Sequence, residues 1–241
     1  TALSSAHATF VVDHDAAALA EAGLLERLDI QYHFFNRGYA SYEDFLANLS
    51  SRKRKSLKRE RRDALAEGIE VEWLSGSALT EEALDAMFAF YMDTGSRKWG
   101  RPYLNRHFFR LIAETMADEI LLVMARRDGR YIAGAMNVIG PDRLYGRYWG
   151  CIEDHPFLHF ELCYNQAIDY ALAHGLAVVE AGAQGDHKIA RGYEPVLTRS
   201  YHYIAHRGLR RAVEEHLVRE RRAMIAEQVS LAAETPFRKG E

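Results

Sequence analysis

The sequence predicts an α+β fold in which helices flank a mixed, mostly antiparallel sheet. Two apolar runs, residues 120–125 and 131–139, flank the dipeptide Asp128-Gly129, which is a strong signal for an antiparallel hairpin. A helical apolar pattern over residues 157–172 is followed by Gly175 and then by another apolar strand, residues 176–181. Because strands lie on both sides of this helix in sequence, we expect it to cross over between two halves of the sheet.

The other elements follow from apolar periodicity and turn residues. We expect further strands at residues 8–12, 30–36, 69–74, 144–151 and 198–204, and further helices at residues 16–21, 41–49, 52–68, 80–92, 106–117 and 208–233. We interpret residues 1–241 as one domain that contains a basic helical segment, residues 41–68. The chain begins with Thr1 rather than Met, and we expect an upstream half to precede it.

Composition is ordinary for a soluble globular protein, with 48% apolar and 27% charged residues. The formal charge of −3 gives no overall attraction to nucleic acid. Cys151 and Cys163 have no metal-ligand spacing, so we expect neither a disulfide nor a metal site, and a cytoplasmic location. No apolar run approaches the ~20 residues of a membrane span, and no signal peptide opens the chain.

The charge is unevenly distributed, because residues 52–62 hold eight cations and one acid. Like charges so close together cost helix stability, and an anionic partner would offset that cost. The segment is therefore either a solvated face or a phosphate-contacting surface for nucleic acid. The candidate anion ligands are Arg52, Lys53, Arg54, Lys55, Lys58 and Arg59.

A glycine-rich stretch at residues 179–195 predicts a substrate site. Glycines allow close backbone approach, and Lys188 and Arg191 lie three residues apart, on one face of a helical turn. Cations beside a glycine-rich turn that follows a strand suit an anion, and Gln184 and Gly185 belong to the same turn. The alternative is an ordinary connection with surface charges.

Two aromatic residues are candidates for the wall of a substrate cleft. Trp99 lies in the break at residues 95–103, where cations and aromatic residues stand between glycines. Tyr148 lies in the strand at residues 144–151, and its hydroxyl either donates a hydrogen bond to substrate or packs in the core.

The chain resembles the GNAT acyltransferase fold, and more closely the Fem-like family of peptidoglycan biosynthesis and recognition, related to the FemABX aminoacyltransferases. The resemblance runs over nearly the whole chain and rests on residues 50–55, 144–150, 153–164 and 180–195. It implies an aminoacyl-tRNA donor, a peptidoglycan peptide or another amine as acceptor, and a preceding GNAT-like half. Other GNAT proteins use acetyl-CoA, which is held by a glycine-rich loop at the start of the central helix. The corresponding turn, residues 149–156, lacks that loop and carries Glu153 and Asp154, so the resemblance favours tRNA over acetyl-CoA.

Aminoacyl transfer needs a base for the amine proton and a donor for the oxyanion. Glu161 and His155 are the candidate catalytic residues, and His159 and His187 are further candidate bases. Glu161 is either a desolvated base or a member of a salt bridge, for example with Arg147. Three functions stay open: a Fem-type acyl or aminoacyltransferase, a non-catalytic module that recognises peptidoglycan or RNA, and a CoA-dependent N-acetyltransferase.

Overall fold

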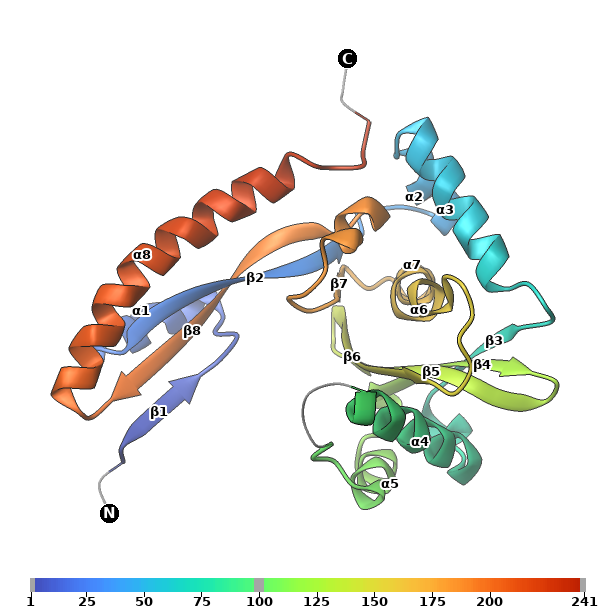
Figure 1. The fold of residues 1–241 in the computed structure, drawn as a ribbon, viewed down its shortest axis with the longest axis horizontal. Helices are drawn as coiled ribbons and strands as arrows, with labels where there is room; N and C mark the ends of the chain where they lie inside the picture. The colour runs from blue at the N-terminus through green and yellow to red at the C-terminus, as the bar shows by residue number, and fades with distance from the viewer. Residues whose placement is uncertain (1–2, 98–101, 239–241) are drawn as a thin grey trace.

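The computed structural model describes residues 3–97 and 102–238 and contains one eight-stranded sheet in the order β1-β8-β2-β7-β6-β5-β4-β3 (Figure 1). All neighbouring strands are antiparallel except β6 and β7, which are parallel. The strands are β1 (Ser5–Ala8), β2 (Leu25–Phe35), β3 (Glu70–Leu74), β4 (Ile120–Arg127), β5 (Arg130–Ile139), β6 (Arg143–Cys151), β7 (Val178–Glu180) and β8 (Glu194–Ile204). This mixed, mostly antiparallel sheet flanked by helices confirms the predicted α+β fold class.

The helices lie on both faces of the sheet. They are α1 (Asp13–Glu21), α2 (Tyr42–Ala47), α3 (Ser51–Ala64), α4 (Glu81–Arg97), α5 (Arg106–Thr115), α6 (Leu158–Phe160), α7 (Gln166–Ala173) and α8 (Arg207–Ala232), with the π-helical η3 (Glu161–Asn165) and the 3₁₀ turns η1 (Gly76–Ala78), η2 (Ala117–Glu119) and η4 (Asp186–Arg191). In the body of the molecule, α4 and α5 cover one face, and α6 and α7 lie against the other (Figure 1).

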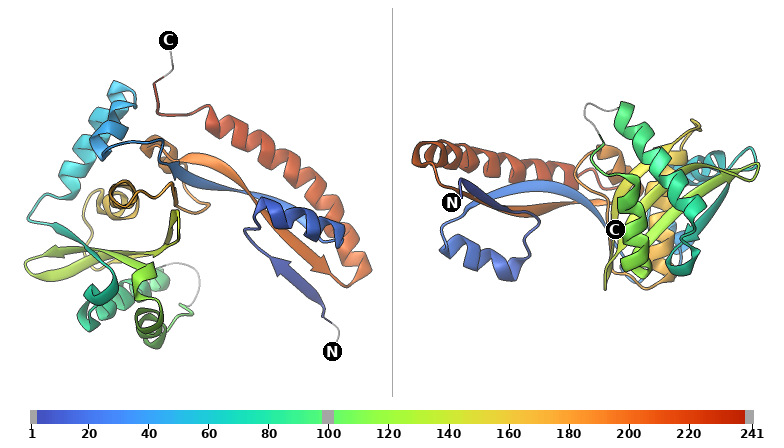
Figure 2. Two further views of the ribbon diagram at one scale, coloured as in Figure 1. Left: turned by 180° about the vertical axis from the view of Figure 1, so that it is seen from behind. Right: turned by 90° about the horizontal axis from the view of Figure 1, so that it is seen from below.

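The molecule has a compact body and a projecting arm. The arm consists of β1 and the long strands β2 and β8, with α8 packed along both long strands and α1 on the opposite side (Figure 2). The body has two apolar clusters, one on each face of the sheet. The first joins the central helix, through Leu162 and Ala167, to Phe45 of α2, and the second joins Met87 of α4 to Phe109 of α5.

The predicted crossover is confirmed: α6, η3 and α7 form one central helix between the parallel strands β6 and β7. Several predicted boundaries are wrong: β2 and β8 begin at Leu25 and Glu194, before their predicted starts at residues 30 and 198, and the first strand and the basic helix end earlier than predicted. Residues 9–12 leave the first strand because Phe10 adopts a left-handed φ of 56°, which ends the pairing of β1 with β8 at Ala8. The basic helix ends at Ala64 rather than at residue 68, because Glu67 and Gly68 take positive φ values of 59° and 75°.

Candidate functional site

The candidate site lies where β6 and β7 separate. These strands pair only between residues 143–145 and 178–180. From Gly146 to Cys151, β6 is paired with β5 alone within residues 3–97 and 102–238, so its other edge has no strand partner in this part of the chain. A cavity of about 640 Å³ opens at this edge.

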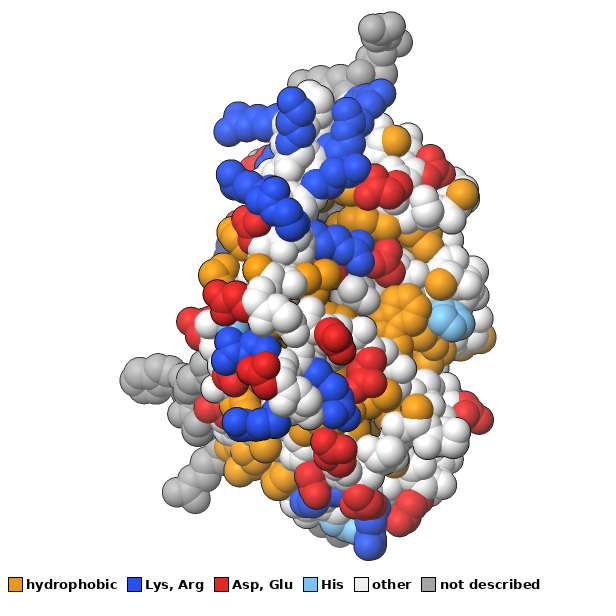
Figure 3. Space-filling view, turned by 90° about the vertical axis from the view of Figure 1, so that its right-hand side faces the viewer, with side chains coloured by type: hydrophobic (Ala, Val, Ile, Leu, Met, Phe, Trp, Pro, Cys, Tyr) orange, Lys and Arg blue, Asp and Glu red, His pale blue; other side chains and the backbone are white. Residues whose placement is uncertain are grey.

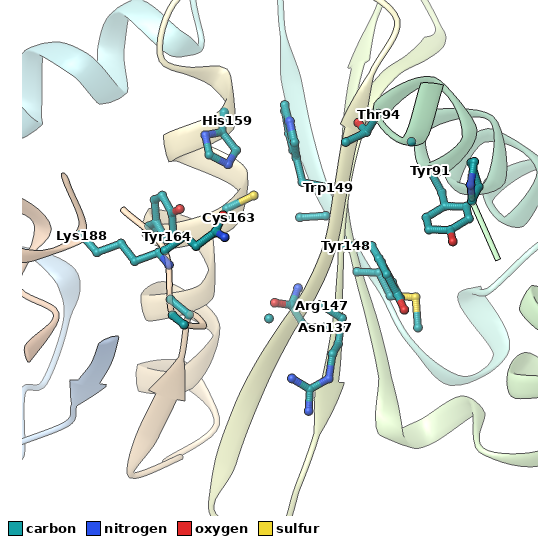
Figure 4. Close-up of a pocket in the computed structure, with 18 of the residues that line it drawn as sticks. Tyr91, Thr94, Asn137, Arg147, Tyr148, Trp149, His159, Cys163, Tyr164 and Lys188 are labelled. Atoms are coloured by element: carbon teal, nitrogen blue, oxygen red, sulfur yellow. The ribbon is translucent and has the colours of Figure 1, made fainter. Parts of the chain in front are cut away.

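Side chains from both faces of the sheet line this cavity, as Figure 4 shows. Tyr91 and Thr94 of α4 approach from one face, and His159, Cys163 and Tyr164 of the central helix approach from the other. The cavity therefore passes through the sheet between β6 and β7. It is thus bordered by side chains from both faces of the sheet.

Glycine and a β-bulge shape the β6 wall. Met136 of β5 pairs with Tyr148, whereas Asn137 pairs with Gly146, so Arg147 is an extra residue in β6. A Cβ atom at Gly150 would lie 2.0 Å from the backbone oxygen of Phe90, so this glycine allows α4 to pack directly on the strand. The bulge and the close helix bring Arg147 and α4 to the cavity lining.

Lys188 is the buried cation of the cavity lining, whereas Arg147, the other lining cation, is exposed. It lies in η4, only 3% of its surface is exposed, and burial lowers the pKa of its ammonium group to about 8. Its Nζ donates to the Gly182 carbonyl oxygen over 3.3 Å and lies 5.4 Å from the centre of the Tyr32 ring. An ammonium group has three N–H donors, and only this one hydrogen bond forms among the described residues. Lys188 can therefore bind an oxygen of a substrate.

The loop before η4 has a conformation that depends on glycine. Gly185 has a φ of 101°, and a Cβ atom there would lie 2.3 Å from the His187 ring. Its carbonyl oxygen accepts the Lys188 backbone N–H over 3.1 Å, which begins the turn. Gln184, just before it, lines the cavity with Lys188. The structure thus brings together three of the residues predicted from this stretch.

Arg191 lies away from the cavity lining, although it is only three residues from Lys188. Its guanidinium group donates to Glu60 of α3 over 2.6 Å, stacks 3.6 Å from the centre of the Phe160 ring and is 6% exposed. The Arg191 guanidinium, which the sequence suggested as a ligand for a substrate anion, is therefore already paired with the Glu60 carboxylate. Arg191 instead attaches η4 to the basic helix.

Glu161 is fully buried in an ion-pair network, and it is not on the cavity lining. Its carboxylate lies 3.2 Å from Arg61 Nε and accepts hydrogen bonds from Asn165 and Gln166 over 2.8 and 2.7 Å. Burial raises its pKa, and Arg61 opposes that shift. Arg61 also pairs with Asp169. The partner is therefore Arg61 rather than Arg147, and Glu161 lies at the π-helical turn of the central helix.

His155 borders a second cavity of about 400 Å³, which shares Thr94, Trp149 and His159 with the first. Its Nε2 lies 3.0 Å from Glu153, and Glu153 also pairs with Arg127 over 2.9 Å. The pKa of Glu153 is lowered by its hydrogen bond to His155. His155 therefore lines only the smaller cavity, whereas His159 lines both the 640 Å³ and the 400 Å³ cavity.

Tyr148 lines the cavity on the α4 face, where its hydroxyl lies 2.7 Å from that of Tyr103. Burial raises its pKa, so the phenol stays protonated at neutral pH. Trp99, the other aromatic candidate, lies outside the described residues.

Comparison with known proteins gives the family. The model of the FemAB-like family, described as peptidoglycan biosynthesis and recognition, matches residues 1–239. The chain belongs to the FemAB-like family. No curated protein sequence matches it. The solved structure of FemX is similar to this FemAB-like chain with a TM-score of 0.61 and 14% identity, over 88% of this chain and 74% of FemX.

Two other solved structures are similar to this FemAB-like chain. The L-PGS structure from Bacillus licheniformis has a TM-score of 0.58 at 11% identity, over 88% of this chain and 73% of that one. The C-terminal domain of a putative lysylphosphatidylglycerol synthetase from Agrobacterium fabrum has a TM-score of 0.56 at 13% identity, over 89% and 72% of the two chains. At these identities the likeness establishes the fold alone.

The basic surface of the FemAB-like chain lies on α3, and its cations gather over this helix in the upper part of Figure 3. Arg52, Lys55 and Arg59 are exposed, and Lys53 is half-buried. None of these four has an ion pair in residues 3–97 and 102–238. Arg54 donates to the Ala47 carbonyl oxygen over 3.5 Å, and Lys58 pairs with Glu43. Four of the six predicted anion ligands are therefore available to a partner.

Sequence reasoning missed Asn137, which lines the cavity from β5. The available signal was a single amide in an otherwise apolar strand, residues 131–139. It also missed Tyr91 and Thr94, because their helix comes close only through the packing at Gly150.

The described part of this FemAB-like chain, residues 3–97 and 102–238, contains neither a candidate membrane span nor a candidate group of metal ligands. No helix there is both long and apolar enough to cross a membrane. No group of three or more His, Cys, Asp or Glu side chains there could hold a metal ion.

Proposed function

We propose that this chain is a Fem-type transferase, which moves an aminoacyl group from aminoacyl-tRNA to an amine of a peptidoglycan peptide in the cavity between β6 and β7. The observation that carries the proposal is a cavity that crosses the sheet and holds a buried lysine with free donors. Membership of the FemAB-like family supports the same reaction class. The 640 Å³ volume is within the range of small-molecule sites, so only the acylated end of the donor would enter.

The proposed reaction is nucleophilic acyl substitution. The amine nitrogen attacks the ester carbonyl carbon, the new C–N bond forms, and the ester C–O bond to the ribose breaks. His159, on the lining of both cavities, takes the proton of the amine and returns a proton to the departing ribose oxygen. Lys188 stabilises the negative charge that develops on the carbonyl oxygen, in a buried setting where its charge is screened little by water.

The turn before the central helix disfavours acetyl-CoA as the donor. In residues 152–157 there is no glycine, and Phe157 has a strained left-handed φ of 64°. Glu153 and the exposed Asp154 place carboxylates where a pyrophosphate would have to bind.

The direct test is transfer of a radiolabelled amino acid from aminoacyl-tRNA to a soluble peptidoglycan precursor peptide. We expect amide-linked product with the wild-type chain and a loss of ~10²–10⁴-fold in the His159→Gln variant, because the base is removed. Acetyl-CoA with the same peptide is the control donor. Product from acetyl-CoA alone would replace this proposal with N-acetyl transfer, and no product from either donor would favour a recognition module.

The basic surface of α3 is proposed to hold the phosphates of the tRNA. We expect the Arg52→Gln, Lys55→Gln, Arg59→Gln triple variant to bind tRNA more weakly. The plot of log affinity against log salt concentration has a negative slope, and its magnitude should decrease by about 2–3. Each lost phosphate contact lowers that magnitude by ~0.7–0.9. Binding isotherms at four salt concentrations measure this slope.

A matched variant removes the same charge from α8, at the exposed Arg207, Arg219 and Arg222. We expect its slope to stay close to that of the wild type. Equal losses in the two triple variants would mean that net charge, and not the α3 surface, governs the binding.

A further inference from the structure

Two residues of the cavity lining have a buried polar atom without a hydrogen-bond partner among residues 3–97 and 102–238, Thr94 at Oγ1 and Asn137 at Nδ2, and Asn137 is the more deeply buried of the two. Asn137 lies within the apolar strand β5 and is 2% exposed, yet its Nδ2 makes no hydrogen bond with any of residues 3–97 and 102–238. A buried amide left in this state destabilises the folded protein. Buried polar groups are nearly always paired, so an unpaired one needs an explanation.

Asn137 faces the reacting side of the cavity. Side chains alternate along a strand, so Asn137 shares a face with Ala135, which packs in the cluster of Leu162 and Tyr164. Its partner in β6 is Gly146, the first residue beyond the pairing of β6 with β7. Gly146 has no side chain to fill the space beside Asn137. Asn137 therefore opens onto the central-helix face of the cavity, which Tyr164 and Lys188 also line (Figure 4).

The chemistry of this position selects an oxygen ligand. A carboxamide N–H donates and cannot accept, so its ligand must present a lone pair, and the neighbouring side chain on the same face of β5, Ala135, is apolar. A cationic or purely apolar ligand would leave the N–H unpaired. A carbonyl oxygen fits, and it fits better still when it gains negative charge in the transition state.

We propose that the Asn137 Nδ2–H is the hydrogen-bond donor to the carbonyl oxygen of the transferred acyl group, together with the ammonium of Lys188. This inference rests on the proposed function and adds a second donor to it. The cost of the unpaired amide in the free protein is then relieved when the acyl group binds.

Asn137→Leu, compared with Asn165→Leu, separates a ligand-binding role from a structural one. Both asparagines are 2% exposed, but Asn165 donates to Glu161 over 2.8 Å and accepts from Tyr42 over 2.9 Å. We expect Asn165→Leu to lower the melting temperature by several degrees, since it removes one hydrogen bond from each of two buried partners, Glu161 and Tyr42. Asn137→Leu should leave the melting temperature unchanged or raise it. An equal fall in both variants would overturn the proposal.

The Asn137→Leu variant should also transfer the acyl group about 10²-fold more slowly, as expected for the loss of one oxyanion donor. An unchanged rate in a folded variant would contradict the assignment.

Binding of a small amide to Asn137, here called the carbonyl site, can also be measured by NMR when no reaction takes place. In ¹⁵N-labelled protein, N-acetyl-alaninamide should shift the side-chain NH₂ signals of Asn137 and leave those of Asn165 in place. If the wild type transfers nothing but these signals shift, the proposed function fails and the carbonyl site stands. If the signals stay in place at saturating probe, the carbonyl site fails.

Discussion

Replacing Lys188 with Met should reduce aminoacyl transfer by on the order of 10³-fold while making the folded protein more stable at pH 7. The loss of rate follows from removing the positive charge nearest to the proposed oxyanion. The gain in stability follows from the burial of that charge, which holds the Lys188 pKa at about 8 against an ordinary value of 10.5. Below pH 8 the ammonium is protonated in both the folded and the unfolded chain, and its burial costs about 3 kcal/mol.

The stability difference between Lys188→Met and the wild type should depend on pH. Between pH 8 and 10.5 the unfolded chain binds more protons than the folded one, so wild-type stability rises with pH in this window. The advantage of Lys188→Met in the free energy of unfolding should therefore shrink from pH 7 to pH 9.5. Urea titrations at the two pH values measure it, with the exposed Lys58→Met as the control for stability. A variant that is less stable than wild type at pH 7 would show that Lys188 mainly supports the fold.

Replacing Arg61 with Met should destabilise the protein by about 3–5 kcal/mol at pH 7, because it leaves Glu161 as a buried carboxylate without its cation. Losing the attraction of Arg61 raises the Glu161 pKa further, so protonation relieves the cost as the pH falls. The deficit in unfolding free energy should thus be smaller at pH 5 than at pH 8.

Glu161→Gln in the Arg61→Met background is the matched control. It removes the unpaired charge, and we expect it to restore most of the lost stability. The single variant Glu161→Gln also tests the alternative role of Glu161. Transfer at close to the wild-type rate is expected for a structural ion pair, whereas a loss of ~10²-fold or more would make Glu161 the general base.

Local patterns in the sequence predicted the sheet well. The Asp128-Gly129 turn and the helix between two apolar strands place the hairpin and the crossover correctly, because both signals are carried by residues close in sequence. The arm was harder to predict, since the paired residues of β2 and β8 are more than 150 positions apart in the chain. Only the C-terminal part of each of these two strands was predicted. Strand pairing of that kind depends on contacts that no local period records.

The site was predicted in part for the same reason. Lys188 and Gln184 follow a strand and a glycine-rich turn, a local signal that singles them out in the sequence, and both line the cavity in the structure. Arg191 was not separable from Lys188 in sequence, because its partner Glu60 lies 131 residues earlier. Asn137 and Thr94 reach the cavity only through the bulge in β6 and the packing of α4, which the sequence does not reveal.

The most direct test of the central claim is an experimental structure of the chain with a non-hydrolysable aminoacyl-adenosine amide. We predict that its acyl group lies between the open edge of β6, residues 146–151, and Lys188, with its carbonyl oxygen within hydrogen-bond distance of Lys188 Nζ. An analogue bound elsewhere, with this cavity empty at saturating ligand, would contradict the account.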